Sequence, residues 1–382
     1  MQSSRTQKPL THRVPLVKNA LINEKEARRA LSKFVLTAPR LSMGEQCFAF
    51  EKIFAKKQGR KEAVLFSSGS SANLAMLQAL KNLGKLKDGD KVGFSALTWA
   101  TNVMPIVQLN LIPVPIDCDP TTLNCMKEVA MPALLKEKCK AFFITNALGF
   151  AGDLDKIERT CKKNNIIVIE DNCESLGTEL HAGKTGNFSL ASSFSFFISH
   201  HMSTIEGGMV TTDDHEFAEM LRIVRSNGWD RNLHPTRQDH WRKKHGVKSD
   251  FHAKYTFYEL GYNLRPTEIT GFLGQHQLPY IDKNGKIREK NFKRVYAAMQ
   301  KNDDFLPLDW SHIKVLYAFA LPFVLKTPAL RHHYIQKFHE AGVEIRPMIA
   351  GNMQRQPFYT KYIKKTYHLP GSDFLHDNSF YA

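Results

Sequence analysis

Short apolar runs alternate with longer helical stretches from about residue 60 onward, and this alternation limits the possible folds more than any other feature of the chain. Each run is apolar enough to be buried on both faces, which is typical of strands in a parallel sheet. Helical stretches at residues 102–109 and 154–164 separate some of the runs. Strands and helices that alternate in this way predict an α/β fold with a mostly parallel sheet. The predicted strands are residues 63–66, 91–96, 111–117, 141–145 and 165–171.

A change of character after about residue 275 indicates a second, smaller domain. A long charged helix is predicted at residues 283–300, and the apolar run 316–325 follows it. A chain of 382 residues is long enough for one large domain and a smaller one. We expect an N-terminal segment at residues 1–30, a large domain at residues 31–275 and a small C-terminal α/β domain at residues 276–382.

The chain carries a formal net charge of +16, which favours anionic partners. Both a phosphorylated small molecule and a nucleic acid would satisfy this charge. The basic pairs are scattered, however, and the sequence contains no zinc-finger, RRM-type or basic-zipper motif. We therefore expect no nucleic-acid partner.

The cysteines and the N-terminus bear on the cellular compartment. The six cysteines form no C-x-x-C pair and no Cys/His group with zinc-finger spacing, so neither a disulfide framework nor a structural metal is expected. The N-terminus lacks the apolar run of a secretory signal, and no stretch approaches the roughly 20 apolar residues that span a bilayer. The sequence predicts a cytoplasmic protein without a membrane partner.

The first candidate site is the turn SSGSS at residues 67–71, between a predicted strand and a predicted helix. Small residues such as Gly69 and Ser70 let an anion approach the backbone, and the N–H groups and dipole of a helix start favour phosphate there. Serine is also a common helix cap and glycine a common turn former, so this motif alone does not establish a phosphate site.

The second candidate is Asp171, at the carboxyl end of the predicted strand 165–171. Open α/β sheets bind their ligands at this edge. A carboxylate here can pair with a protonated pyridine nitrogen and hold the ring as an electron sink. The other interpretation is an aspartate that caps the next helix.

The run FSFFISHHMSTIEGGMV at residues 194–210 is the most specific motif. It resembles the cofactor-lysine segment of the DegT/DnrJ/EryC1/StrS family of sugar aminotransferases, which use pyridoxal phosphate (PLP). His200 stands at the lysine position. The residues on both sides of the run align this position with His200 and not with His201. Within the family, a histidine here resembles the sugar 3-dehydratase branch. The resemblance implies an aspartate-aminotransferase-like fold (fold type I), with residues 31–275 as the cofactor-binding domain.

Further segments resemble the same family over nearly the whole chain. The resemblance implies that Trp99, in TWAT, stacks on the cofactor ring, and that Asn263, in GYNLRPTE, reaches the cofactor phosphate of the neighbouring subunit. Arg346, in EIRPM, and Asn352 resemble the substrate-side segment of the dehydratase branch. A core tryptophan, a helix-start turn and a surface arginine are the alternatives for these segments. We also place Ser195 and Glu174 among the cofactor-binding residues and His201 among the substrate-binding residues.

The histidine changes the implied reaction. A lysine amine forms a covalent imine with PLP, and an imidazole cannot. The resemblance therefore implies a non-covalently bound cofactor, mainly pyridoxamine phosphate (PMP), whose amine condenses with a nucleotide-linked 4-keto-6-deoxy sugar before the 3-hydroxyl is expelled. A neutral imidazole, with a usual pKa of about 6.5, suits proton removal, so His200 is the predicted catalytic base. An amino-group donor such as glutamate and a homodimer with shared active sites are the other expected partners.

One type of member of this branch uses an iron–sulfur centre for a reductive final step. Cys173 resembles the first cysteine of that centre, but no cysteine follows it in the chain. Too few ligands remain for a cluster. We therefore expect a dehydratase without an iron–sulfur cluster.

Two other classes of protein remain open. A sugar aminotransferase would share the fold and most site residues, although it would need a lysine at position 200. A non-catalytic sugar-binding scaffold is the more remote alternative.

The basic segment at residues 229–255 is predicted to be a loop that meets the substrate diphosphate at the shared active-site mouth, with a solvated surface as the alternative.

Overall fold

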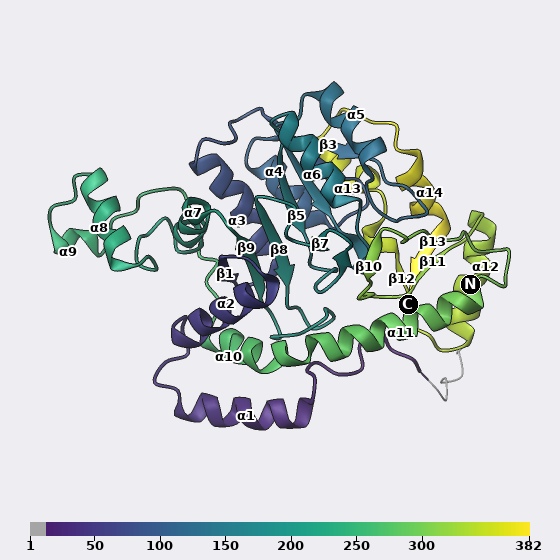
Figure 1. The fold of residues 1–382 in the computed structure, drawn as a ribbon, viewed down its shortest axis with the longest axis horizontal. Coiled ribbons are helices and arrows are strands. Elements are labelled where there is room, and N and C mark those ends of the chain that lie inside the picture. Colours follow the sequence, from purple (N-terminus) through teal and green to yellow (C-terminus); the bar gives the residue numbers. More distant parts are fainter. Residues whose placement is uncertain (1–12) are drawn as a thin grey trace, which may run out of the picture.

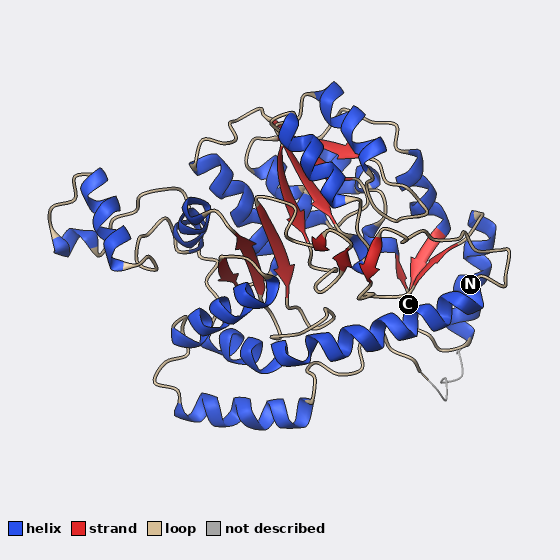
Figure 2. Cartoon of the chain, viewed as in Figure 1, coloured by secondary structure: helices blue, strands red, loops and turns tan. Residues whose placement is uncertain are grey.

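The computed structural model describes residues 13–382. A seven-stranded sheet forms its centre (Figures 1 and 2). Strand β9 runs antiparallel to both of its neighbours, and the other strand pairs are parallel. The predicted α/β fold is confirmed. The order across the sheet is β1 (Glu62–Phe66), β9 (Gly208–Thr212), β8 (Ala191–Ser195), β5 (Ile167–Asp171), β4 (Ala141–Thr145), β2 (Lys91–Ser95) and β3 (Ile112–Ile116).

Both faces of the sheet are buried, as the apolar runs predict. In β1, Val64 and Phe66 face a core shared with helices α3 (Gly69–Asn82) and α7 (His215–Arg225). The alternate residues of the same strand, Ala63 and Leu65, face a second core that includes Phe50 and Phe54 of α2 (Glu45–Gln58). Because successive strand side chains point to opposite faces, helices cover the sheet on both sides.

The other helices connect the strands or form the C-terminal part of the chain. The predicted helices at residues 102–109, 154–164 and 283–300 are confirmed as α4, α6 and α11. Among residues 13–382, no helix combines the length and the apolar character that crossing a membrane requires. The remaining α-helices are α1 (Glu24–Thr37), α4 (Met104–Gln108), α5 (Lys127–Glu137), α6 (Leu154–Lys163), α8 (Pro235–Lys244), α9 (Asp250–Ala253), α10 (Glu268–Gln277), α11 (Ile281–Met299), α12 (Pro328–Glu340), α13 (Pro357–Tyr362) and α14 (Pro370–Asn378).

Two three-stranded sheets join distant parts of the chain. The first has the order β10 (Ile313–Val315), β6 (Glu179–Leu180), β7 (Gly183–Lys184), and the second has the order β11 (Pro322–Val324), β13 (Ser379–Tyr381), β12 (Arg346–Pro347). Beyond these sheets, Met353 and Tyr359 pack into the core beside α3. The C-terminal region therefore contacts the large sheet through several elements, and the three-part domain division stays a prediction.

Helices α8 and α9 project at the left of Figure 1, and α8 is attached to α7 by Arg237 and Trp241, which both donate to Glu219. The prediction of a loop at residues 229–255 is therefore wrong, because this segment contains the helices α8 and α9. Pro235 occupies the first turn of α8, where its missing N–H costs no hydrogen bond, and the Gln238 side chain accepts from Arg242 one turn later. These local contacts allow a strongly charged segment to form a helix.

Candidate functional site

A cavity of about 280 Å³ opens at the carboxyl ends of the parallel strands. Thr145 and Asp171 end β4 and β5, and Ser195 ends β8. This is the edge of the sheet at which the sequence predicts a ligand. The predicted site residues that line the cavity are Gly69, Ser70, Trp99, Asp171, Glu174, Ser195 and His200.

The turn between β1 and α3 fits a phosphate group. Ser68 caps the helix, since its Oγ accepts from the N–H of Ser71 at 3.0 Å. The N–H groups of Gly69 and Ser70 belong to the first turn, whose donors have no carbonyl partner within the helix. A Cβ on Gly69 would lie only 2.7 Å from the Cβ of Ser195, so a glycine is required for the two segments to meet.

Asp171 is buried at the floor of the cavity and is held by three donors. Its Oδ2 accepts from the side-chain amides of Asn73 and Asn102, both at 2.8 Å, and its Oδ1 accepts from the N–H of Cys173 at 2.9 Å. Sequence reasoning missed both asparagines. The signal was weak: Asn73 stands among apolar residues of α3, where a buried amide needs a polar partner.

Trp99 supplies a flat aromatic surface at the cavity. It follows β2, and the residue is 57% exposed although it lines the site. An exposed tryptophan beside a buried carboxylate and a phosphate-type turn fits the binding of a planar, phosphorylated ring. The residues present therefore fit the predicted pyridoxal-type cofactor.

His200 lies in the loop that follows β8 and is held as a neutral imidazole. Its Nδ1 is 2.6 Å from the carbonyl oxygen of Cys173, which can only accept, so Nδ1 carries the proton. Burial lowers the pKa of His200 to about 4, and the charge of Asp171 opposes this shift. The imidazole is therefore neutral at physiological pH, with Nε2 available to accept a proton.

None of the residues lining this cavity, all of which lie within the described part of the chain, is a lysine. Lys184 points elsewhere, since its Nζ donates to the carbonyl oxygen of Lys57 at 2.8 Å. A covalent link between the protein and a pyridoxal-type cofactor needs a primary amine in the cavity. The geometry therefore favours a cofactor that is held without a covalent link.

Glu174 lines the cavity close to Asp171. Its Oε2 accepts from the N–H of Leu148 at 2.9 Å. Burial is the main reason that the pKa of Glu174 is raised to about 8; the hydrogen bond from Leu148 opposes this shift and the charge of Asp171 adds to it. The cavity thus contains a neutral imidazole and a carboxyl group whose pKa is raised by burial.

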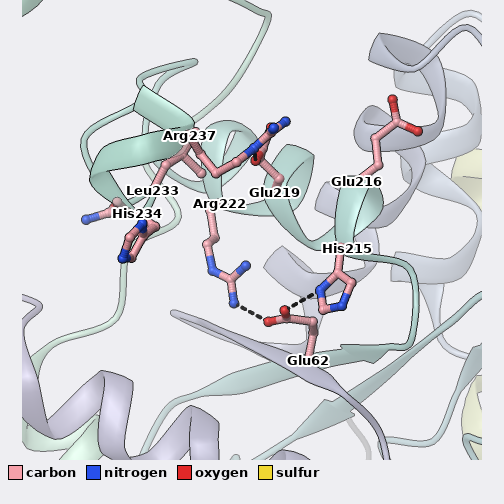
Figure 3. A pocket seen from close by; sticks show the side chains of 9 residues that line it. Glu62, His215, Glu216, Glu219, Arg222, Leu233, His234 and Arg237 are labelled. Carbon is pink, nitrogen blue, oxygen red and sulfur yellow. Dashed lines mark hydrogen bonds and ion pairs between the residues drawn. The ribbon is translucent and has the colours of Figure 1, made fainter. Parts of the chain in front are cut away.

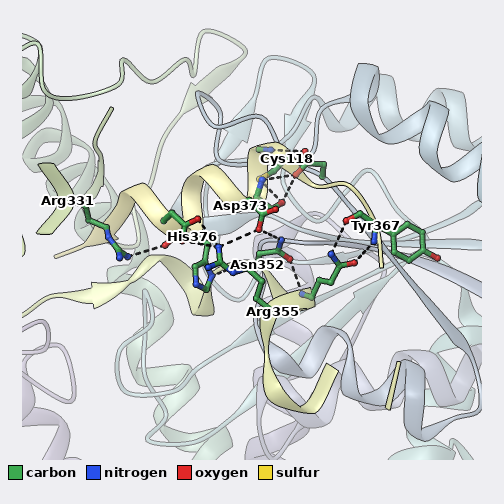
Figure 4. Close-up of polar contacts among 12 residues, drawn as sticks. Cys118, Arg331, Asn352, Arg355, Tyr367, Asp373 and His376 are labelled. Carbon is green, nitrogen blue, oxygen red and sulfur yellow. Dashed lines mark hydrogen bonds and ion pairs between the residues drawn. The ribbon is translucent and has the colours of Figure 1, made fainter. Parts of the chain in front are cut away.

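Two predicted residues lie behind the cavity wall. His201 is buried with its Nε2 at 2.7 Å from the carbonyl oxygen of Tyr317, and burial lowers its pKa to about 3. Asn352 is also buried, and its amide donates to Asp373 while its backbone N–H donates to His376 (Figure 4). Neither residue lines the cavity, so their predicted contacts with substrate stay predictions.

The other two predicted residues are exposed. Arg346 forms an ion pair with Glu344 and stands opposite Tyr381 in the β12–β13 register. Asn263 accepts from the Arg265 side chain at 3.0 Å and does not line the cavity of its own chain. One residue further on, the carbonyl oxygen of Leu264 accepts from the N–H of Ser67, so this segment runs along the phosphate-type turn.

Three further cavity residues could not be predicted from the sequence. Phe319, Ile349 and Tyr381 line the site although they lie in the C-terminal part of the chain. The Phe319 ring centroid is 5.2 Å from that of His200. Ile349 has a φ of 22°, a strained value for a branched residue, and such strain gathers at functional sites.

A second cavity, of about 600 Å³, lies between α7 and the start of α8 (Figure 3). Most of its charged residues are paired with one another: Glu62 bonds to His215 and Arg222, and Glu219 bonds to Arg237. Close to it, Arg242 bonds to Asp230 at 3.0 Å. None of residues 229–255 lines the first cavity of this chain. The predicted contact of this segment with a substrate diphosphate is therefore not made within one chain.

Comparison with known proteins defines the class of protein that carries this site. The model of the DegT/DnrJ/EryC1/StrS aminotransferase family matches residues 22–380. The chain therefore belongs to this family.

Several similar relatives within the family are 3-dehydratases. The chain is 34% identical, over 91% of its length and 90% of the relative's, to GDP-4-keto-6-deoxy-D-mannose 3-dehydratase of Escherichia coli O55:H7. It is also 34% identical to the protein of the same name from Yersinia pseudotuberculosis, over 87% of the chain and 84% of the relative. A solved GDP-4-keto-6-deoxymannose-3-dehydratase with a trapped PLP-glutamate geminal diamine superposes with a TM-score of 0.85 at 32% identity, over 96% of this chain and 94% of that one.

Proposed function

We propose that the chain is a PLP/PMP-dependent 3-dehydratase that removes the 3-hydroxyl of a nucleotide-linked 4-keto-6-deoxyhexose. It would act in deoxysugar and lipopolysaccharide O-antigen biosynthesis. The observation that carries the proposal is the neutral His200, held at the cofactor site by the Cys173 carbonyl in a cavity lined by no lysine within the described residues. The 34% identical dehydratase of Escherichia coli supports the same reaction.

The cavity lining supports a role for a different group of this chain at each part of the cofactor. The α3 start with Gly69 and Ser70 would hold the phosphate, together with the Ser195 hydroxyl. Asp171 would pair with the ring nitrogen, and Trp99 would cover one ring face. Bound in this way, PMP supplies an amine for the 4-keto group and a ring that withdraws electrons.

His200 acts through proton transfer. Its Nε2 is free because Nδ1 is bonded to Cys173, and this bond also fixes the direction of the ring. A base with one fixed free nitrogen can accept a proton next to the cofactor ring and cannot bind the cofactor covalently. This favours elimination over amino-group transfer.

The partners and the assembly follow from the same proposal. The substrate is a nucleotide diphosphate sugar, and glutamate is the proposed donor that restores PMP, as the PLP-glutamate adduct trapped in a related structure suggests. Asn263 does not line its own cavity, which supports a homodimer in which each chain completes the site of the other. We expect the enzyme to work in the cytoplasm.

A sugar aminotransferase of the same family is the second candidate. It would share the fold, Asp171 and the phosphate turn, but it needs a lysine to hold the cofactor between turnovers. Apart from these shared features, nothing in the cavity lining favours an aminotransferase. A non-catalytic scaffold would have no use for a neutral base next to a cofactor site.

Borohydride reduction tests the proposal directly. We expect no reduced pyridoxyl group on any lysine in the site, Lys184 included, when the protein is incubated with PLP, because the cavity offers no amine to the cofactor. The same protein should release a 3-deoxy-4-keto sugar from one of a panel of nucleotide 4-keto-6-deoxy sugars when glutamate is present, as measured by mass spectrometry. A lysine adduct on a cavity peptide would contradict the proposal.

Two substitutions at one position separate the candidates. His200→Asn should keep the cofactor bound and reduce dehydration by at least about 100-fold, since general-base catalysis contributes that much. His200→Lys should allow the reducible adduct and shift the products toward amino sugars. Unchanged dehydration in His200→Asn would place the base elsewhere.

A further inference from the structure

Two adjacent histidines attach the loop between β8 and β9 to two distant segments of the chain. Nδ1 of His200 donates to the carbonyl oxygen of Cys173, which follows β5. The Nε2 of His201 lies 2.7 Å from the carbonyl oxygen of Tyr317, between β10 and β11. The loop is therefore held by the large sheet through one imidazole and by the C-terminal part of the chain through the next.

The imidazole of His201 is a neutral hydrogen-bond donor. A carbonyl oxygen can only accept, so Nε2 carries the proton. Nδ1 is buried and has no hydrogen-bond partner among the described residues, so a second proton there would create a buried charge without an acceptor. Burial, and next the charge of Arg288, lower the pKa of His201 to about 3. The two histidines thus carry their protons on opposite ring nitrogens.

The segment that accepts from His201, residues 317–319, is itself held closely. A Cβ on Gly149 would lie only 2.4 Å from the first carbonyl oxygen of this segment, so a glycine is required for the close approach. The N–H of Phe319 donates to the carbonyl oxygen of Leu148 at 2.9 Å. The carbonyl oxygen of Phe319 accepts from Arg288 of α11 at 2.7 Å. His201 is therefore bonded to a fixed part of the fold.

The Phe319 side chain contacts both imidazoles. Its ring centroid lies 5.2 Å from that of His200 and 6.0 Å from that of His201. Phe319 and His200 line the cavity, whereas His201 is buried and does not. Any effect of His201 on the cavity is therefore transmitted by its neighbours, above all by His200.

We propose that His201 is a positioning residue for the base His200. This inference rests on the proposed dehydratase function. The hydrogen bond to Tyr317 holds the loop, so that Nδ1 of His200 stays bonded to Cys173 and Nε2 stays its one free nitrogen. Catalytic groups work only in a narrow range of positions, and a misplacement of about 1 Å can cost about 100-fold in rate. His201 itself transfers no proton.

Nitrogen-15 NMR of the histidine rings in the full chain with PMP bound tests the arrangement. The wild-type protein should carry a proton on Nδ1 of His200 and on Nε2 of His201. The His201→Asn side chain ends too early to reach Tyr317, so the Nδ1–H signal of His200 should be lost by exchange with water. His201→Gln places its amide near the Nε2 position and should retain the signal. A wild-type His201 protonated on Nδ1, or an unchanged His200 signal in His201→Asn, overturns the inference.

Kinetics separate a positioning role from a substrate contact. His201→Asn should lower kcat by about 10- to 100-fold with little change in KM, and His201→Gln should recover most of the loss. His312→Leu is the matched control, because Nε2 of His312 lies 2.8 Å from the carbonyl oxygen of Ala151 and His312 does not line the cavity. This control should keep wild-type kinetics.

Two kinetic results overturn the inference. A rise in KM without a loss of kcat would assign His201 to substrate binding, and equal losses in His201→Asn and His201→Gln would show that the donor is not what matters. A wild-type protein that dehydrates no substrate would instead refute the proposed function. The NMR measurement would still decide whether His201 holds the ring of His200, because it requires no turnover.

Discussion

At the scale of single residues, the orientation of Asp171 depends on amides that no motif predicts. Asn102 is fully buried and donates one of the two amide hydrogen bonds to Asp171 Oδ2. Asn102→Ala would leave the carboxylate one donor short, at a cost of about 1–3 kcal/mol. We expect PMP to bind at least about tenfold more weakly, as measured by calorimetry. The exposed Asn164→Ala is the matched control, and equal affinity in both variants would contradict this role.

The site residues that could be predicted are those with a local signature. Gly69 stands in a strand-to-helix turn, Asp171 ends an apolar strand, and His200 occupies a recognisable position in a family motif. Tyr381 carries no such signature, because its place in the cavity depends on the pairing of β13 with β11 and β12. Contacts between distant segments are set by tertiary packing, which a single sequence does not reveal.

At the scale of elements, apolar strands were predictable and the polar strand β8 was not. Its sequence, ASSFS, is fully buried, yet most of its side chains are hydroxyls with partners inside the protein. Ser192 accepts from Asn172 and Ser193 bonds to Asn73. Buried hydroxyls are tolerated when they are hydrogen-bonded, so a strand of this kind does not show up as an apolar run.

Helix α8 offers a prediction about its own attachment. Its Arg242 bonds to Asp230, whose side chain is only 3% exposed. Arg242→Ala should therefore lower the stability of the protein by about 1–3 kcal/mol, because a nearly buried carboxylate loses its partner. The neighbouring Lys243→Ala should change stability little. Urea denaturation measures both variants, and equal midpoints would show that the ion pair does not hold α8.

At the scale of the whole molecule, the α/β architecture could be predicted because strand burial repeats along the chain. The assembly could not be predicted in the same way, because a single chain does not show whether a second copy completes its site. Asn263 lies beside the phosphate-type turn of its own chain through the Leu264–Ser67 hydrogen bond, yet it does not line that cavity. Two arrangements follow: the side chain serves its own site after a local movement, or it serves the site of a second copy.

Mixing two inactive variants distinguishes these arrangements. His200→Asn would remove the proposed base, and Asn263→Asp would place a negative charge against the cofactor phosphate that Asn263 is proposed to contact, so each variant alone should be nearly inactive. If sites are shared, a heterodimer has one site with both defects and one site with neither. Random re-pairing of equal amounts should then restore about a quarter of wild-type dehydration, because half of the dimers each carry one intact site. Size-exclusion chromatography confirms the re-pairing. No gain of activity in re-paired heterodimers would show that each chain contains its whole site and would assign Asn263 to its own cavity.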